Sequence, residues 1–263
     1  MPPQGKPLTL EQCTAIALKY HPSLRANQAA IEASKARVEQ ALASYYPQVN
    51  FGATYTYSSA NFSSAARTGD RNWNMYDFYS FGPTATLNIY DFGRTANNVT
   101  VNRENMKASE EDLTTARQLV VLNVKQAFFG VLATLRLIEV AEEVVKQDKL
   151  RLEQAQGFYQ AGTRPKIDVT KAEVDLANAE LNLIRAKNNF QLARVTLNNT
   201  MGLQQSLSFA IEDAMDIKPV SITLEEILKL SYAQRPELLQ LKARQRSLDA
   251  TVKLADASYY PTL

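Results

Sequence analysis

Few residues in this sequence are suited to covalent or metal chemistry. A thiol can act as a nucleophile or metal ligand, and an imidazole as a general base, but the chain has one cysteine, Cys13, and one histidine, His21. A cysteine zinc cluster needs several thiolates, and a disulfide within the chain needs two. The sequence contains no phosphate-binding loop, nucleophile elbow or recognisable pair of catalytic carboxylates. It therefore predicts no enzyme, no metal site and no cofactor.

The polar residues that do recur suit the wall of a water-filled passage. From Val49 to Ser58 and from Tyr79 to Ile89, apolar and polar residues alternate with the period of a β-strand. Each segment has about the length of a tilted strand that crosses a bilayer. We expect one face, which lacks polar side chains apart from tyrosine, to contact lipid: Phe51, Ala53, Tyr55, Phe81, Ala85 and Leu87. We expect the other face, which is polar but uncharged, to line a lumen: Thr54, Thr56, Thr84, Thr86 and Asn88.

Aromatic residues gather around these two strands, and aromatic side chains favour the boundary between lipid and water. Two groups are candidates for belts at opposite membrane surfaces. Tyr45, Tyr46, Tyr90 and Phe92 lie at the junctions of strands and helices, whereas Trp73, Tyr76 and Phe78 lie near the polar connection Ser59–Asn74. Two strands alone leave open edges, so a membrane hairpin requires further copies to close a barrel. A hairpin in a soluble protein, packed by its apolar face on another element, fits the same alternation.

Two long segments predict antiparallel helices. Between Arg94 and about Tyr159 there is no proline, and apolar or small residues recur at spacings of four and three, as in a coiled-coil seam. Roughly 65 residues would make a rod of about 100 Å. Gly162 and Pro165 would end this helix and begin a returning one that stops near Gly202. The outgoing seam comprises Val120, Val124, Ala127, Val131, Thr134, Ile138, Ala141 and Val145, and the returning seam comprises Val169, Ala172, Leu176, Ala179, Leu183, Ala186, Phe190, Ala193 and Leu197.

The chain begins the same unit twice. Residues 8–49 align with residues 222–263 without a gap, and fourteen aligned pairs are identical. The junction Ala43–Pro47 recurs as Ala257–Pro261. Thr9 and Thr223 would each cap a short helix that ends at a proline. His21 aligns with Arg235 and Cys13 with Ile227, so neither position requires its imidazole or thiol, and Cys13 is expected in the core.

Composition and charge further limit the class of protein and the kind of partner. The chain of 263 residues is 45% hydrophobic and 21% charged, as expected for a folded protein. A formal net charge of +2 gives no reason to propose a nucleic acid partner. The sequence divides into helices of the first unit (1–48), a hairpin with its loop (49–90), a helical hairpin (91–202), a linker (203–221) and the start of the second unit (222–263).

In this order of elements the sequence resembles the TolC-like outer membrane efflux and secretion channels of Gram-negative bacteria. The likeness extends over essentially the whole chain. It rests on Leu8–Glu11, Tyr45–Pro47, Ile89–Arg94, Tyr159–Thr163 with Ile167–Val169, and Met201–Gly202.

The resemblance implies a mainly α fold with a β-hairpin. Long antiparallel coiled-coil helices would form an α-barrel as a periplasmic extension, and the hairpin would contribute to an oligomeric transmembrane β-barrel in outer membrane lipid. It also implies a homotrimer that passively conducts substrates delivered by a periplasmic adaptor and an inner membrane pump. The adaptor would dock at the helical reversal, here Ala161, Gly162, Thr163, Arg164 and Pro165.

The chain departs from the family pattern in two places. The reversal reads Ala-Gly-Thr where relatives carry a Val-Gly-Leu-like motif, so a simple glycine helix stop fits equally well. The second hairpin and second long helical pair of the family are missing, so we expect a truncated or fragmentary chain. A soluble coiled-coil scaffold with a docking hairpin is the alternative, and partitioning into detergent or liposomes distinguishes the two.

Overall fold

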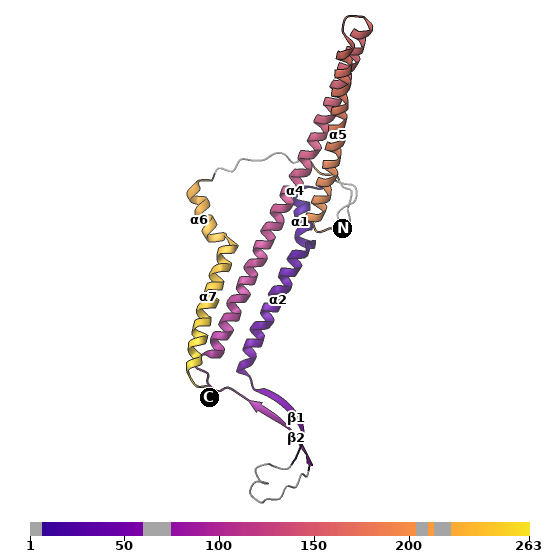
Figure 1. Cartoon of the computed structure of the whole chain (residues 1–263). Coiled ribbons are helices and arrows are strands. Elements are labelled where there is room, and N and C mark those ends of the chain that lie inside the picture. Colours follow the sequence, from indigo (N-terminus) through magenta and orange to yellow (C-terminus); the bar gives the residue numbers. More distant parts are fainter. Residues whose placement is uncertain (1–6, 60–74, 204–209, 213–221) are drawn as a thin grey trace, which may run out of the picture. The chain divides into compact units, whose positions relative to one another are not determined.

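The computed structural model describes residues 7–59, 75–203, 210–212 and 222–263 (Figure 1). Trp73, nearly all of the predicted strand connection and most of the predicted linker lie outside these residues. The chain is mainly helical with a two-stranded hairpin, which confirms the predicted fold class. It divides into two compact units, one of residues 1–31 and 109–239 and the other of residues 32–108 and 240–263. The five-segment division made from sequence stays a prediction.

The repeated sequence folds into repeated elements. Helices α1 (Leu10–Tyr20) and α6 (Leu224–Gln234) both have 11 residues, and α2 (Pro22–Leu42) and α7 (Pro236–Asp256) both have 21. A single 3₁₀ turn follows α2 at Ala43–Tyr45, and another follows α7 at Ala257–Tyr259.

Both threonine caps predicted from sequence are confirmed. The Thr9 hydroxyl accepts from the Gln12 N–H at 3.2 Å, and the Thr223 hydroxyl accepts from the Glu226 N–H at 3.4 Å. In each case the side chain three residues on accepts from the backbone N–H of the threonine in return. These reciprocal bonds satisfy backbone donors that the first helical turn leaves unpaired.

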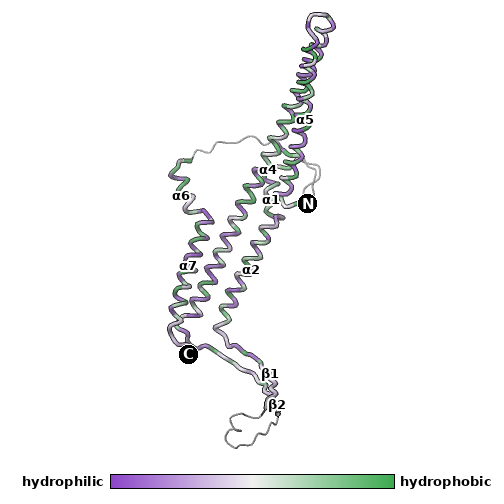
Figure 2. The backbone as a smooth tube through the Cα atoms, in the orientation of Figure 1, coloured by the Kyte–Doolittle hydropathy of each residue, from purple (hydrophilic) through white to green (hydrophobic). Residues whose placement is uncertain are grey.

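From residue 109 onward, α4 (Arg94–Gln160) belongs to the first unit, where it forms an antiparallel pair with α5 (Lys166–Thr200) (Figure 1). All seventeen seam residues predicted from the spacing of four and three are buried or half-buried, so the coiled-coil prediction is confirmed. Polar and apolar residues alternate along both helices (Figure 2). Exposed ion pairs join the helices at Lys149–Glu180 and Glu142–Lys187, but such pairs contribute little to stability. The apolar seam therefore holds the pair together.

The hydrophobic core of the first unit lies where α1, the start of α2, the middle of α4 and the end of α5 meet. Cys13 is buried in this core, as expected, and burial raises the pKa of its thiol to about 11. The thiol therefore stays protonated at neutral pH and packs as a small apolar side chain. The fully buried side chains of the core include Leu8, Val124, Phe128, Leu197 and Met201.

Two glycines end the long helices. Gly162 and Gly202 have φ angles of +71° and +73°, in the left-handed region that glycine adopts without a steric cost. At the first, the Thr163 N–H donates to the Phe158 carbonyl and the Gly162 N–H to the Tyr159 carbonyl. The same pair of bonds recurs around Gly202, from Leu203 and Gly202 to Asn198 and Asn199. Both ends are Schellman motifs, as the sequence positions of the glycines predict.

In the second unit, strands β1 (Gln48–Ser59) and β2 (Met75–Thr86) pair antiparallel along their whole length. The second strand was predicted at Tyr79–Ile89, and this placement is wrong by about four residues at its start. Leu87 and Asn88 lie beyond β2, because the position opposite Leu87 would be Pro47, which has no N–H to donate to the ladder. None of the helices in the described part of the chain is long and apolar enough to cross a bilayer.

Candidate functional site

The strand register of the hairpin determines which side chains share a face, because directly paired residues of an antiparallel ladder lie on the same side. Phe51 pairs with Pro83, Ala53 with Phe81, and Tyr55 with Tyr79. The apolar residues predicted on the two strands therefore share one face, and its large side chains are bare: Phe51 is 73% and Phe81 78% exposed.

The opposite face is polar and uncharged over most of its length. Its directly paired residues include Gln48 with Thr86, Asn50 with Thr84, and Thr54 with Ser80. The predicted lumen-facing residues Thr54, Thr56, Thr84 and Thr86 thus share one side of the hairpin. Their contact with a lumen, and the contact of the apolar face with lipid, stay predictions.

The apolar face ends in a polar contact that sequence reasoning missed. Asp77 lies on this face opposite Tyr57, and the Tyr55 hydroxyl donates to its carboxylate at 2.6 Å. The rings of Tyr55 and Tyr79 lie next to this bond, with centroids 5.0 Å apart. A single acidic residue interrupting an apolar alternation was the signal available in the sequence.

The predicted aromatic belt near the strand connection is divided by the register. Phe78 pairs with Thr56 and so shares the polar face, not the apolar one. Tyr76 occupies the register position opposite Ser58, and Trp73 lies outside the described residues. The aromatic pair on the apolar face is instead Tyr55 and Tyr79.

At the other end of the hairpin, an aromatic cluster forms around a backbone bend. The Tyr90 and Phe92 rings meet edge to face at 4.7 Å, and Phe92 stacks on Tyr260 at 5.0 Å. Phe92 has a φ of +52°, an unusual angle for a residue with a side chain. Tyr260 is the repeat counterpart of Tyr46, and no sequence pattern indicated that it would join this cluster. Tyr45 and Tyr46 remain exposed.

The bend continues into α4 through Asp91. Its carboxylate accepts from the Thr95 N–H at 2.7 Å and from the Gly93 N–H at 3.1 Å. Burial tends to raise the pKa of Asp91, but the hydrogen bonds from Thr95, Gly93 and Arg94 outweigh that effect and hold the pKa below its usual range. A negative charge therefore stands at the positive end of the longest helix, where the helix dipole favours it.

Within the second unit, α7 is fastened to α4 by a buried carboxylate. Glu104 is 7% exposed and accepts from Arg246 and Lys107, both at 2.6 Å. The Ser247 hydroxyl donates to the Val101 carbonyl beside it. Burial tends to raise the pKa of Glu104, whereas the hydrogen bonds and positive charges of Lys107 and Arg246 lower it more, so the net shift is downward.

This shift gives the second unit a pH-dependent stability. A carboxyl with a lowered folded-state pKa stabilises the fold above its unfolded pKa of about 4.3, and this contribution is lost as pH falls through the folded value. We expect Glu104→Gln to destabilise the chain at pH 7, and the difference from wild type to shrink progressively below about pH 4. Urea unfolding at several pH values measures it, with Glu39→Gln at an exposed position of α2 as the control. A difference that is constant from pH 7 to pH 3 would contradict the assignment.

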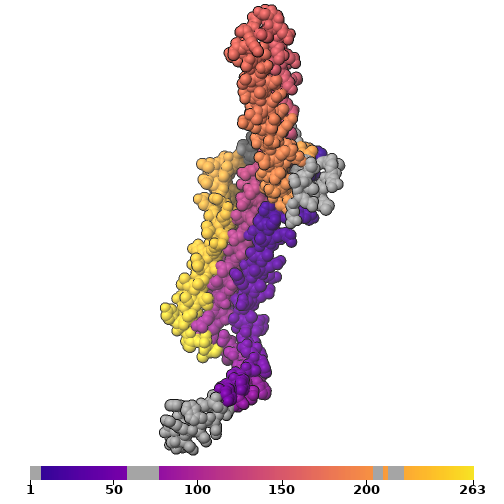
Figure 3. Space-filling model, turned by 45° about the vertical axis from the view of Figure 1, so that its right-hand side comes forward, coloured from indigo at the N-terminus to yellow at the C-terminus, as the bar shows by residue number. Residues whose placement is uncertain are grey.

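The reversal between α4 and α5 presents the five predicted docking residues together. Ala161–Pro165 are all exposed. In Figure 3, the end of the α4–α5 pair that carries this turn is not covered by any other element. Arg164 lies over the Phe158 ring at 5.5 Å and approaches Asp168 at 3.7 Å. The Thr163 hydroxyl donates to the Phe158 carbonyl. The turn is thus locally ordered, and its role in docking stays a prediction.

Comparison with known proteins places this arrangement in a family. The family described as "Outer membrane efflux protein" matches residues 15–203. Among curated proteins, the probable outer membrane lipoprotein SilC of Salmonella typhimurium is 24% identical over 94% of this chain and 52% of its own length. The outer membrane protein TolC of Escherichia coli K12 is 24% identical over 84% of this chain and 46% of its own. The chain therefore spans about half the length of these relatives.

Solved structures show the same fold. A crystal structure of CusC aligns with a TM-score of 0.81 and 21% identity, covering 96% of this chain and 57% of that one. The CmeC outer membrane channel of Campylobacter jejuni aligns with a TM-score of 0.80 and 17% identity, covering 96% of this chain and 54% of that one. The family match extends over most of the chain and includes the hairpin, the Asp91 bend and the α4–α5 pair. The chain belongs to the outer membrane efflux protein family.

Proposed function

We propose that this chain is the part of an outer membrane channel subunit that lines a pore through its β-hairpin and helices. It would conduct substrates passively from a periplasmic adaptor and an inner membrane pump to the exterior, as a homotrimer when complete. In this role it is a conduit and not an enzyme. The observation that carries the proposal is the hairpin register, which gives one bare apolar face and one uncharged polar face.

The exposure of the apolar face supports contact with lipid. Large apolar side chains in contact with water are unfavourable by about 25 cal/mol per Å², so a face with Phe51, Tyr79 and Phe81 bare requires a cover. The polar face carries hydroxyl and amide groups that water satisfies. A two-stranded hairpin with these faces fits a shared barrel wall, whose open edges neighbouring copies would pair.

The repeat supports assembly with further copies. On α7 and the 3₁₀ turn after it, the alanines are buried at positions 243, 250 and 257. Their counterparts on α2 and its 3₁₀ turn, Ala29, Ala36 and Ala43, are exposed. A stripe of small residues that is covered in one copy of a repeat and bare in the other fits an α2 that packs on a neighbouring subunit. Small side chains allow the close helix approach that this packing needs.

The exposure of the turn between α4 and α5 supports adaptor docking there. Ala161–Pro165 form an ordered, solvent-exposed turn at the end of the rod, held by the Thr163 and Gly162 hydrogen bonds. A docking surface at this position would lie on the helical rod, which this proposal puts on the periplasmic side of the membrane. The relatives named above are outer membrane proteins, which supports the same location here.

Membrane contact is tested by a pair of adjacent substitutions. Phe81→Asp puts a charge on the apolar face, and Ser80→Asp puts the same charge on the polar face. We expect the wild-type chain to float with phospholipid vesicles, Phe81→Asp to reduce the bound fraction about tenfold, and Ser80→Asp to change it less than about twofold.

Flotation on a density gradient measures the bound fraction, with circular dichroism to confirm that each variant is folded. Equal losses for the two variants would contradict the assigned faces. A wild-type chain that remains soluble without vesicles or detergent would favour the alternative, a coiled-coil scaffold with a docking hairpin.

A further inference from the structure

The apolar face of the hairpin changes its chemistry near the strand connection. Asp77 lies opposite Tyr57 in the register, and the next pair on the same face is Tyr55 with Tyr79. These four residues form a tyrosine–aspartate patch. All three tyrosines are more than half exposed, and Asp77 is exposed as well.

Contacts within the patch bring its groups together. The Tyr55 hydroxyl donates to Oδ1 of Asp77 at 2.6 Å, and the rings of Tyr55 and Tyr79 lie 5.0 Å apart with their planes tilted by 36°. Tyr57 is the direct cross-strand neighbour of Asp77, and the Cβ atoms of such neighbours are about 4.5–5.5 Å apart. One small group can therefore reach the carboxylate and a tyrosine ring at the same time.

The patch favours a cation by the sign of its groups. An ionised carboxylate accepts hydrogen bonds and donates none, and the Tyr55 hydroxyl occupies only one of its acceptor positions. Aromatic rings attract cations that lie over their faces within about 6 Å of the ring centre. Among the residues that the structure describes, no lysine or arginine forms an ion pair with Asp77. The carboxylate is thus open to a cation from outside the chain.

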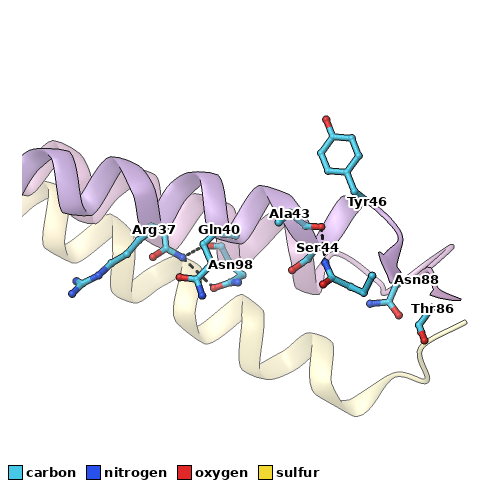
Figure 4. Close-up of a pocket in the computed structure, with 11 residues that line it drawn as sticks. Arg37, Gln40, Ala43, Ser44, Tyr46, Thr86, Asn88 and Asn98 are labelled. Atoms are coloured by element: carbon cyan, nitrogen blue, oxygen red, sulfur yellow. Dashed lines mark hydrogen bonds between the residues drawn. The ribbon is translucent and has the colours of Figure 1, made fainter. Parts of the chain in front are cut away.

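The level of the patch along the hairpin fits a membrane surface. At the helix end of the hairpin, Tyr46 is exposed and its ring points away from Ser44 and Asn88 (Figure 4). Tyr57 follows Tyr46 by eleven residues, which is about 36 Å of extended chain. With the usual strand tilt of about 35–45°, this becomes roughly 25–30 Å along the bilayer normal, close to the apolar band of membrane barrels. If Tyr46 lies at one surface, the patch lies among the headgroups of the other.

A primary ammonium suits this patch better than a quaternary one. Its N–H groups can donate to the Asp77 carboxylate while its charge lies against a tyrosine ring. A trimethylammonium has no hydrogen to donate and is recognised by cages of aromatic rings. The tyrosines of the patch lie on one face of a two-stranded sheet and form no such cage. Among phospholipid headgroups, ethanolamine carries the primary ammonium.

We propose that the tyrosine–aspartate patch binds the ammonium of an ethanolamine phospholipid headgroup, and that Asp77 selects it. This inference rests on the proposed function, because it requires the apolar face to contact lipid. It goes further by assigning a headgroup chemistry to one end of that face.

The test compares vesicles that differ in headgroup alone. Phosphatidylethanolamine or phosphatidylcholine with the same acyl chains is mixed with an equal share of phosphatidylglycerol, and the 263-residue chain is floated with each. EDTA is present, so no divalent cation can bridge the carboxylate to a lipid phosphate. We expect about fivefold tighter binding to the ethanolamine vesicles, the gain for an exposed ion pair with an aromatic contact.

The variants assign this preference to the patch. Asp77→Asn should reduce it to less than about 1.5-fold, whereas binding to choline vesicles should stay within about twofold of wild type, because the apolar face is unchanged. Tyr57→Leu removes a ring but keeps an apolar side chain, and it should lower the preference about twofold. Glu39→Gln is the matched control, because it removes a negative charge from an exposed position of α2 in the same unit, and it should keep the full preference.

The possible failures are distinct. A preference that persists in Asp77→Asn would come from lipid packing and would overturn the inference. Equal binding of the wild-type chain to the two vesicles would also overturn it, but would leave membrane contact intact. A chain that binds neither vesicle would overturn the proposed function together with this inference.

Discussion

Replacing Gly202 by alanine is expected to cost about 3 kcal/mol or more of folding stability. Two effects add. A non-glycine residue in the left-handed region costs about 1–2 kcal/mol, and the backbone of Gly202 has a φ of +73°. A Cβ at this position would also lie 2.9 Å from the Cα of His21 and 3.2 Å from the Pro22 ring, where overpacking costs about 1–3 kcal/mol.

Neither neighbour of Gly202 can move away easily. His21 ends α1 and Pro22 begins α2, so both belong to the backbone junction of two helices. The His21 ring is tied to this junction as well, since its Nδ1 accepts from the Ser23 N–H. The close approach thus joins the end of α5 to the α1–α2 corner, and an added methyl group would separate them.

Gly162→Ala is the control for the Gly202 prediction. Gly162 has nearly the same φ, +71°, but a Cβ there would have no neighbour within 4 Å. It should lose only the conformational contribution of about 1–2 kcal/mol. Urea unfolding followed by circular dichroism measures both variants. If Gly202→Ala and Gly162→Ala lower the free energy of unfolding by the same amount, the close approach of Gly202 to His21 does not contribute to the cost of the substitution.

Phe128→Ala is expected to remove about 3–5 kcal/mol, because it deletes a fully buried ring from the centre of the first unit's core. The ring belongs to the cluster that joins α1, α4 and α5, including Cys13, Val124 and Leu197. The cavity left behind would weaken all of these contacts at once. Thermal and urea unfolding both measure the loss.

The neighbouring residue provides the comparison. Phe129 packs edge to face on Phe128 at 5.9 Å but is only partly buried. Phe129→Ala should therefore cost clearly less than Phe128→Ala, because less apolar surface returns to water. A larger loss at Phe129 would show that the core is centred on the other side of α4.

Most elements were predictable from the sequence because their signals are local. A helix seam is encoded by residues three and four apart, and a cap by residues three apart, so the α4–α5 pair and the Thr9 and Thr223 caps followed from spacing. The Schellman glycines followed from their position after a periodic run. The self-similarity of the two units likewise predicted that α6 and α7 would repeat α1 and α2.

The strands were less predictable. Alternation assigned the residues of each strand to two faces, but not the partner of each residue. The register moved β2 to Met75–Thr86 and put Phe78 beside Thr56 on the polar face. Pro47 lies outside both strands and determines where the pairing stops, so Leu87 and Asn88 lie beyond the end of β2.

What the sequence by itself determined is therefore the set of elements, their periodic faces and their ends. Only the tertiary structure decided which distant residues meet: Arg246 with Glu104, Tyr260 with Phe92, and Gly202 with His21. The physical reason is that turns, caps and periodicity depend on neighbours within one or two helical turns. Contacts across 142 residues, such as that of Arg246 with Glu104, depend on how whole elements pack, and no local pattern records that choice.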